Sequence, residues 1–335
     1  MIPQTQTLKA KHDWQRALAC TINSAEELLS RLGLSGQLQG LSADAVRQFP
    51  VKVPESYVKK MRYGDPHDPL LRQVFPLLHE AEAVSGYLLD PVGDNLAVTS
   101  PGILQKYHGR ALLVTTGICA IHCRYCFRRH FPYSDSNPLA SQWPQTQQQL
   151  AADNSITEVI LSGGDPLILS NKIIGRLLDD LASIPHIKRL RIHTRLPVVL
   201  PERIDKALVD NLSTTRLKVV VVIHANHANE IDSIAANALH KLKIAGCQLL
   251  NQTVLLKGIN DNVEALSALS ERLNDVDVMP YYLHLLDKVA GAHHFDQTES
   301  TAIELIDALR TRLPGYLVPR LVREQQGKAS KTIIR

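Results

Sequence analysis

The sequence has few cysteines, few aromatic side chains and no long apolar run. Its 335 residues include only five cysteines, an odd and sparse number that argues against a framework of disulfides. The longest β-branched run, Val219 to Ile223, is far too short to cross a bilayer. The opening segment, Met1 to Trp14, is polar and does not look like a signal peptide. We therefore expect a cytoplasmic protein that has no membrane partner.

Excess charge and several common catalytic motifs are also missing. The formal net charge is +4 at pH 7 without a dense block of Lys or Arg, so we expect no nucleic acid partner. The chain has no G-x-x-x-x-G-K-[ST] phosphate loop, no G-x-S-x-G elbow and no H-E-x-x-H zinc motif. The sequence therefore lacks the motifs that usually indicate phosphoryl transfer, α/β-hydrolase chemistry or zinc proteolysis. Hydrophobic residues make up 44% of the chain, as in globular proteins, which excludes wholesale disorder.

From about residue 110, short aliphatic runs alternate with amphipathic stretches. The expected strands are 111–116, 158–161, 189–194, 217–223, 249–256 and 278–286. The expected helices are about 140–152, 171–183, 202–212, 230–245, 262–274 and 299–312. Six such repeats predict a parallel sheet with right-handed crossovers, either a partial barrel or a doubly wound sheet. In both folds, ligands bind at the carboxyl ends of the strands.

Three of the five cysteines, Cys119, Cys123 and Cys126, lie close together in the spacing C-x3-C-x2-C. A zinc site would need a fourth ligand, which His122, His130 or a more distant histidine could supply. A four-iron cluster held by three thiolates would leave one iron open to a substrate-like chelate, which is a catalytic arrangement. The arginines beside the cysteines would favour thiolates and offset the charge of a cluster.

The cysteine motif, with Tyr125 before its last cysteine, resembles the signature of radical S-adenosylmethionine (SAM) enzymes. In that superfamily the three cysteines hold a [4Fe–4S] cluster, and SAM chelates the fourth iron. The run from Gly163 to Pro166 is similar to the superfamily's glycine motif, where the backbone approaches the amino group of SAM. The resemblance implies five SAM-binding residues, which are Gly163, Gly164, Asp165, His224 and Gln252. It also implies an α/β fold, a partial (βα)6 TIM-like barrel with a mainly helical N-terminal region.

Longer segments resemble the lysine 2,3-aminomutase family. They are C-R-Y-C-F-R-R-H from Cys123, R-I-H-T-R-L-P-V-V-L-P from Arg191, N-Q-T-V-L-L-K-G-I-N-D from Asn251 and P-Y-Y-L-H-L-L-D from Pro280. That family also binds pyridoxal phosphate, as a Schiff base with a lysine near the C-terminus. Lys331, in Lys331-Thr332, fits the family pattern, and Lys328 stays open as an alternative. Arg110 matches a family position near the phosphate of that cofactor.

The resemblance also implies which residues bind the substrate. Arg128 matches the family position for the substrate's carboxylate, to which a guanidinium offers a bidentate fork. Asp287 and Glu324 match two acids that bind the far ammonium group of lysine. Glu324 stands where the family has an aspartate, so its carboxylate reaches one methylene further. A glutamate mutase would need cations here, so the pair of acids favours L-lysine as the substrate.

The resemblance implies an isomerase that forms β-lysine, with electrons from an external flavodoxin- or ferredoxin-like donor. The short C-terminus after Lys331 and the segment P-Y-Y-L-H-L-L-D-K-V resemble one branch of the family. That branch makes (R)-β-lysine for translation elongation factor P, to which a lysyl-tRNA-synthetase-like ligase attaches it. Two alternatives stay open: an aminomutase for glutamate or arginine, and a non-catalytic iron–sulfur or zinc-binding protein that docks a translation partner.

Three regions are expected along the chain. Residues 1–105 form a mostly helical N-terminal region, and residues 106–295 form the barrel. Residues 296–335 supply a helix and the pyridoxal-lysine segment, which we expect to close the mouth of the barrel. Such closure would desolvate the lysine, so that its amine could lose its proton.

Overall fold

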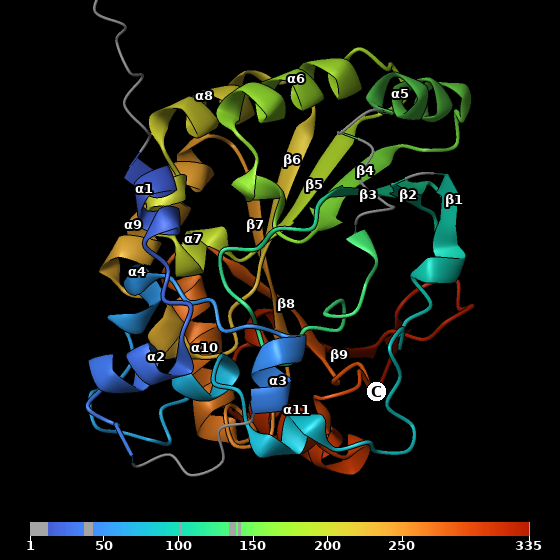
Figure 1. Ribbon diagram of the computed structural model, residues 1–335. Helices are drawn as coiled ribbons and strands as arrows, with labels where there is room; N and C mark the ends of the chain where they lie inside the picture. Colours follow the sequence, from blue (N-terminus) through green and yellow to red (C-terminus); the bar gives the residue numbers. More distant parts are fainter. Residues whose placement is uncertain (1–12, 37–42, 101, 134–138, 140–141, 335) are drawn as a thin grey trace, which may run out of the picture.

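The computed structural model describes residues 13–36, 43–100, 102–133, 139 and 142–334. One sheet of ten strands organises this part of the chain, and its strand order follows the sequence from β1 to β10 (Figure 1). The strands from β3 to β9 are parallel to their neighbours, whereas β1, β2 and β10 pair antiparallel at the two edges. The strands are β1 (Val98–Ser100), β2 (Ile103–Leu104), β3 (Arg110–Thr116), β4 (Glu158–Gly163), β5 (Arg189–Thr194), β6 (Lys218–Ile223), β7 (Gln248–Val254), β8 (Met279–His284), β9 (Arg320–Arg323) and β10 (Thr332–Ile333).

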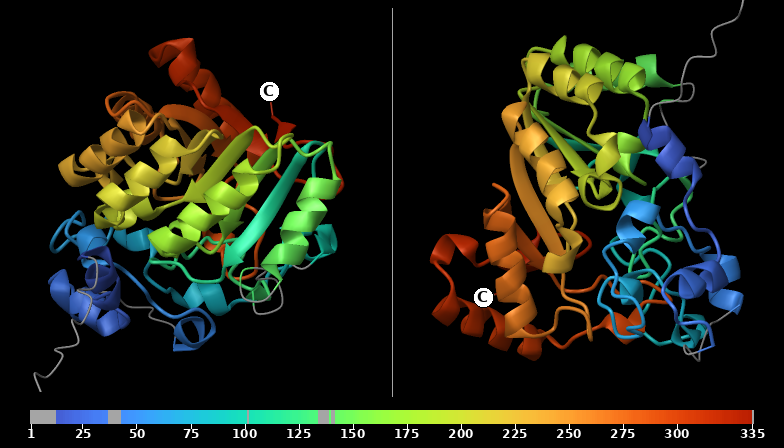
Figure 2. Two further views of the ribbon diagram at one scale, coloured as in Figure 1. Left: turned by 90° about the horizontal axis from the view of Figure 1, so that it is seen from above. Right: turned by 90° about the vertical axis from the view of Figure 1, so that its left-hand side faces the viewer.

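Helices connect the parallel strands and cover the outer side of the sheet (Figure 2). They are α5 (Trp143–Ala152), α6 (Asn171–Ala182), α7 (Leu196–Val199), α8 (Lys206–Thr214), α9 (Ser233–Ile244), α10 (Val263–Asn274) and α11 (Glu299–Arg312). Most of them begin at a polar residue that caps free backbone N–H groups; Ser170, for example, accepts a hydrogen bond from the N–H of Ile173. Helix α6 buries Ile174, Leu177, Leu178 and Leu181, the spacing of an amphipathic helix. None of the described helices has both the length and the apolar character that crossing a membrane requires.

The predicted α/β fold with a parallel sheet is confirmed. Each predicted strand and helix has a counterpart, and each parallel strand pairs with the next one in the chain. A doubly wound sheet would reverse its order at a switch point, so the sequential order supports the partial barrel. The start of the expected helix 140–152 lies outside the described residues. Strand β9 was not expected, because its four residues begin and end with arginine and show no aliphatic run.

The two edges of the sheet meet through side chains. Tyr107, just before β3, donates a hydrogen bond from its hydroxyl to Glu324, just after β9, at 2.5 Å. A Cβ added to Gly93 would lie 2.8 Å from the Cδ of Gln326, so these two segments pack directly on each other. In Figure 1 the red C-terminal segment accordingly comes close to the cyan segment that precedes β1. These contacts close the side of the barrel that no strand pairing closes.

The N-terminal region, which we expected to be mostly helical, consists in its described part of short helices joined by longer irregular segments. Its helices are α1 (Asp13–Ala19), α2 (Ala25–Arg31), α3 (Ala43–Gln48) and α4 (Glu55–Val58). Buried side chains of α1, α2 and α4, among them Trp14 and Tyr57, belong to the same hydrophobic cluster as Val198 and Ile223 of the barrel. The N–H of His122 in the cysteine loop donates to the carbonyl of Lys52 at 2.9 Å. The N-terminal region therefore packs directly against the loop that carries the three cysteines.

Candidate active site

Three half-buried thiols lie on one loop at the carboxyl end of β3. Burial, together with the neighbouring Cys123, raises the pKa of Cys126 to about 11. Burial and the charge of Cys126 likewise raise the pKa of Cys119. A negative charge on one sulfur opposes the ionisation of the others. All three thiols are therefore deprotonated together only when a bound cation compensates their charge.

The donor set of this loop, three thiols, is chemically suited to a cluster of several metal ions. Among the described residues, no three His, Cys, Asp or Glu side chains converge on one position for a metal ion. A [4Fe–4S] cluster does not need such convergence, because each thiolate binds a different iron. The two histidines nearest in sequence that could complete a zinc site approach backbone carbonyls: His122 that of Pro50, at 2.7 Å, and His130 that of Ala290, at 3.4 Å.

Gly163 and Gly164 hold the end of β4 against the start of the cysteine loop. The N–H of Gly164 donates to the carbonyl of Thr116 at 2.7 Å. A Cβ on Gly163 would lie 2.5 Å from that carbonyl oxygen, and its φ of +115° already disfavours other residues. A Cβ on Gly164 would lie 2.5 Å from the carbonyl oxygen of Ile118. The two glycines thus allow the end of β4 to pack closely against the backbone of the cysteine loop. Their contact with SAM stays a prediction.

Asp165 is buried, and protein donors occupy its carboxylate. The hydroxyl of Thr194 donates to both oxygens, at 2.7 and 2.9 Å, and the N–H groups of Arg195 and Leu167 donate at 2.7 and 3.1 Å. Burial raises its pKa to about 6, although these hydrogen bonds oppose the rise. The carboxylate joins the ends of β4 and β5. We therefore expect any effect of Asp165 on SAM to act through the position of the backbone.

A buried ion triad ties the cysteine loop to the N-terminal region. The Oε2 of Glu80 lies 2.5 Å from the Nη2 of Arg124 and 3.1 Å from the Nη2 of Arg129. Arg124 also donates to the carbonyl of Phe49 at 2.5 Å. We expected the arginines beside the cysteines to favour thiolates and offset the charge of a cluster. In the structure, Arg124 and Arg129 pair with Glu80, and the positive charges of Arg128 and Arg129 still act to lower the pKa of Cys126.

A chain of alternating charges crosses between the two edges of the sheet. Its members, in order of contact, are Arg128, Asp94, Lys106, Glu324 and Lys331. The Nε of Arg128 donates to Asp94 at 2.6 Å, and the Nζ of Lys106 lies 2.6 Å from the same carboxylate. Lys106 lies 3.8 Å from Glu324, whose other oxygen is 2.6 Å from the Nζ of Lys331. Three predicted site residues, Arg128, Glu324 and Lys331, are therefore linked in one network.

The two acids predicted to bind lysine have pKa values shifted in opposite directions. Exclusion of water raises the pKa of Asp287 to about 7, although the charge of Lys331 opposes the rise. Burial also acts to raise the pKa of Glu324, but the charge of Lys331 and hydrogen bonds from Lys331 and Tyr107 outweigh it and lower this pKa. At neutral pH, Glu324 is ionised and Asp287 is close to its titration point.

Three histidines line the barrel interior near Lys331: His193 on β5, His224 after β6 and His284 on β8. Burial is the main cause that lowers the pKa of each, that of His224 to about 4, and the charge of Lys331 adds to it. His224 shares a hydrogen bond with Gln252, another predicted SAM-binding residue. The Nε2 atoms of His193 and His284 are buried and find no hydrogen-bond partner among the described residues. Such atoms fit the presence of a polar cofactor beside Lys331, as pyridoxal phosphate would be.

The structure places the two candidate lysines differently. Lys328 is exposed in the turn between β9 and β10, whereas the side chain of Lys331 is only 23% exposed and pairs with Glu324. Arg110 stacks on the ring of Tyr107, with its Cζ 5.2 Å from the ring centroid. The partial burial of Lys331 supports it as the cofactor-binding lysine. The role of Arg110 at a phosphate stays a prediction.

Three residues of the site, Asp94, Lys106 and Tyr107, were missed by reasoning from the sequence. They lie before β3 in segments without a motif, and they become part of the site only because the C-terminal segment packs beside them. Arg195 follows β5 in the run H-T-R; its position at a strand's carboxyl end marked it as informative, but no role was predicted for it.

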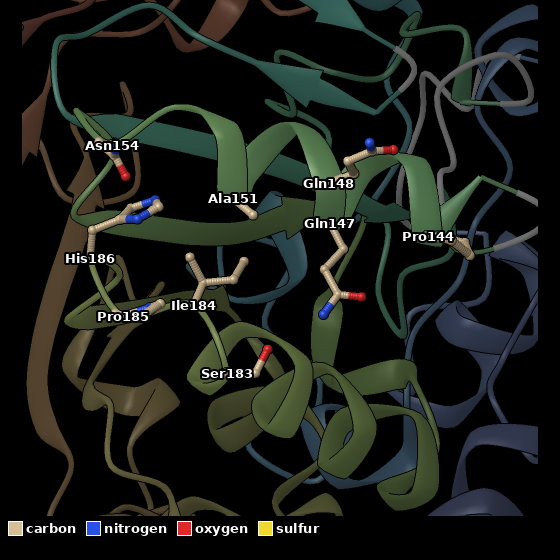
Figure 3. A pocket seen from close by; sticks show the side chains of 9 residues that line it. All are labelled: Pro144, Gln147, Gln148, Ala151, Asn154, Ser183, Ile184, Pro185 and His186. Atoms are coloured by element: carbon tan, nitrogen blue, oxygen red, sulfur yellow. The ribbon is translucent and has the colours of Figure 1, made fainter.

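One surface hollow lies away from this chemistry. It has a volume of about 520 Å³ and is lined by Pro144, Gln147, Gln148, Ala151, Asn154, Ser183, Ile184, Pro185 and His186 (Figure 3). It lies between α5 and the turn after α6, which lead into the amino ends of β4 and β5. Its His186 already contacts the carbonyl of Leu150 at 3.0 Å. The hollow is thus at the opposite end of these strands from the cysteine loop.

Comparison with known proteins identifies the family. Residues 113–269 match the radical SAM superfamily. The chain is 44% identical over 329 residues to L-lysine 2,3-aminomutase of Escherichia coli strain K12, covering 98% of this chain and 96% of that protein. It is 42% identical over 333 residues to the protein of the same name from Haemophilus influenzae, covering 99% and 98%. The L-lysine 2,3-aminomutase of Clostridium subterminale is 33% identical over 322 residues, covering 96% of this chain and 77% of that protein.

A solved radical SAM methyltransferase from Sphaerobacter thermophilus has a TM-score of 0.44 and 15% identity over 66% of this chain and 68% of that chain. The near end-to-end matches to the bacterial relatives are far more specific. They agree with the cysteine loop, the glycine-seated strand end and the partial barrel described above. The protein belongs to the lysine 2,3-aminomutase family of radical SAM isomerases, which use a [4Fe–4S] cluster, SAM and pyridoxal phosphate.

Proposed function

We propose that this protein converts L-lysine to β-lysine by moving the amino group from Cα to Cβ. One observation carries the choice of substrate: Glu324 and Asp287 both act on an ammonium group, the Nζ of Lys331. Lysine carries the same group at the end of its side chain, and carboxylates are its natural partners. The side-chain carboxylate of a glutamate substrate would be repelled by the same two acids.

Arg128 suits the substrate's carboxylate because one of its donors is free. Its Nε and Nη1 donate to Asp94 and Ser162, at 2.6 and 2.8 Å, whereas its Nη2 makes no hydrogen bond within the described residues. Burial acts to lower its pKa, but the charge of Asp94 more than compensates, so the guanidinium stays charged. A carboxylate that reached Nη2 would form a charge-assisted hydrogen bond in a site with little water.

The chain's own residues would hold the cofactors. Cys119, Cys123 and Cys126 would bind the cluster, and the Nζ of Lys331 would bind pyridoxal phosphate covalently near the unpaired Nε2 atoms of His193 and His284. Together with SAM, these cofactors supply the radical chemistry that lets the nitrogen migrate. The protein binds both ends of the substrate, orients Cα and Cβ, and excludes water from them.

We also infer that the product is (R)-β-lysine made in the cytoplasm for elongation factor P. Its functional partners would be a lysyl-tRNA-synthetase-like ligase and a flavodoxin- or ferredoxin-like electron donor. Support comes from the segment P-Y-Y-L-H-L-L-D-K-V, which contains most of β8 and also Asp287. This role is tested by mass spectrometry of elongation factor P after incubation with the ligase and the reaction product. We expect the factor to carry a β-lysyl group, and a factor that stays unmodified would reject the role.

Anaerobic turnover tests the activity itself. Reconstituted protein is incubated with SAM, pyridoxal phosphate, dithionite and L-lysine, and the products are separated by chiral chromatography. We expect β-lysine only when SAM and pyridoxal phosphate are both present. Cleavage of SAM without consumption of lysine would reject the substrate, and parallel reactions with glutamate and arginine would then identify another. Iron analysis addresses the non-catalytic alternative, because a catalytic cluster requires about four irons per chain.

A further inference from the structure

One buried arginine donates a hydrogen bond from its side chain to a cysteine of the candidate cluster loop. Arg195 lies at the start of α7, and its Nη1 donates to the Sγ of Cys123 at 2.7 Å, across 72 positions of the chain. Its Nη2 lies 2.8 Å from the Oε2 of Glu230, which is also buried. One guanidinium is therefore placed between a thiol sulfur and a carboxylate.

Neutral groups hold this pair in place and exclude water from it. The Nη2 of Arg195 also donates to the Oε1 of Gln73 at 2.7 Å and to the hydroxyl of Tyr57 at 3.1 Å. Glu230 accepts from the backbone N–H of Asn226 at 2.8 Å and from the side chain of Gln73 at 3.2 Å. Because each charge is buried and oriented by several hydrogen bonds, its effect on a neighbouring charge is poorly screened.

The contact distinguishes Arg195 from the arginines of the loop itself. Arg124 and Arg129 pair with Glu80, and Arg128 pairs with Asp94. Among the hydrogen bonds of the described residues, only that of Arg195 joins a guanidinium to a cysteine sulfur. The guanidinium that is hydrogen-bonded to a sulfur therefore follows β5 in the chain and does not belong to the cysteine motif.

We propose that Arg195 and Glu230 set the reduction potential of the [4Fe–4S] cluster, with opposite signs. The inference rests on the proposed function in that Cys123 is taken as a cluster ligand. One electron from a reductant such as dithionite converts [4Fe–4S]2+ to [4Fe–4S]+, with no proton transferred. The cluster gains negative charge, so the N–H···S bond and positive charge of Arg195 stabilise the reduced form. Glu230 offsets part of that effect, since hydrogen bonds to sulfur and nearby charge tune such potentials.

A potentiometric titration with dithionite, followed by electron paramagnetic resonance without SAM, measures the potential directly. Arg195→Gln should lower the ratio of reduced to oxidised cluster about tenfold at a fixed poise, which equals ~59 mV for a one-electron couple. Glu230→Gln should raise the same ratio, because Arg195 is then left without its counter-ion. Tyr57→Phe removes a neutral partner of the same Nη2 and should leave the potential unchanged.

The two signs separate an electrostatic role from a merely structural one. Loss of packing alone would shift the reduction potentials of Arg195→Gln and Glu230→Gln in the same direction. That result would overturn the proposal, and so would unchanged potentials in both variants. If Arg195→Gln fails to fold, Glu230→Gln carries the test alone, and a potential at or below that of the wild type refutes it. Failure of the proposed function is distinguishable, because wild-type protein would then hold no four-iron cluster or Cys123→Ala would keep it.

Discussion

Lys331 and Glu324 face each other because β9 and β10 pair antiparallel, with Thr332 opposite Arg323. The residue before Thr332 therefore lies opposite the residue after Arg323, and the Nζ–Oε2 distance is 2.6 Å. A hairpin of two short strands thus places the candidate cofactor lysine beside an acid seven residues away. This relationship also explains why Lys328, in the intervening turn, is exposed.

We expect Lys331→Ala to lose the absorbance of covalently bound pyridoxal phosphate while it keeps its iron. The reason is that Lys331 is the lysine at the site, partly buried beside Glu324. Lys328→Ala is the matched control, and it should keep both absorbance and turnover. Visible spectra of the two variants, with iron counted in the same samples, check this. Absorbance that persists in Lys331→Ala and vanishes in Lys328→Ala would reverse the assignment.

Glu324→Gln and Asp287→Asn should raise the KM for lysine about tenfold to a hundredfold. Loss of a hydrogen bond to a charged group costs about 1.5–3 kcal/mol, which corresponds to that range. Glu299→Gln is a suitable control, because this exposed acid pairs with Arg323 at 2.9 Å on the outside of the same region. Steady-state kinetics under anaerobic conditions measure all three. An unchanged KM in both test variants would remove the acids from the substrate site.

The activity should depend on the protonation of Asp287. Burial raises its pKa to about 7, so the folded protein favours the neutral acid below that pH. Only the carboxylate attracts an ammonium group, and kcat/KM for lysine should therefore fall as the pH drops through about 7. The same profile for Asp287→Asn should lose this limb, because an amide does not titrate. His224, whose pKa is about 4, stays neutral over this range. A limb that survives in Asp287→Asn would assign it to another group.

Gly164→Ala should reduce the iron bound per chain and destabilise the fold by about 1–3 kcal/mol. A Cβ at this position would lie 2.5 Å from the carbonyl oxygen of Ile118, so the start of the cysteine loop would have to move. Gly315→Ala is the control, since no described residue beyond its two chain neighbours has an atom within 4 Å of the added Cβ. Iron content after reconstitution and urea unfolding test both. Equal iron in the two variants would show that the glycine does not seat the loop.

Much of the fold and part of the site could be read from local patterns. The strands were predictable because those buried on both faces form near-continuous aliphatic runs. The three cysteines were predictable as a site because residues this close in sequence stay close in any fold. The packing role of the two glycines was only partly predictable. Their motif was visible in the sequence, but their contact with Thr116 and Ile118 depends on how β4 packs against the cysteine loop.

The sequence by itself determined the parallel α/β architecture, the cysteine triad and the resemblance that points to the cofactors, since each rests on local spacing and periodicity. Only the tertiary structure decided which charges meet. It paired Arg128 with Asp94, brought Lys106 next to Glu324, and placed Arg195 on Cys123. Those contacts join segments far apart in the chain, and no local pattern encodes them. They exist because the strands end at one mouth and the edges of the sheet meet there.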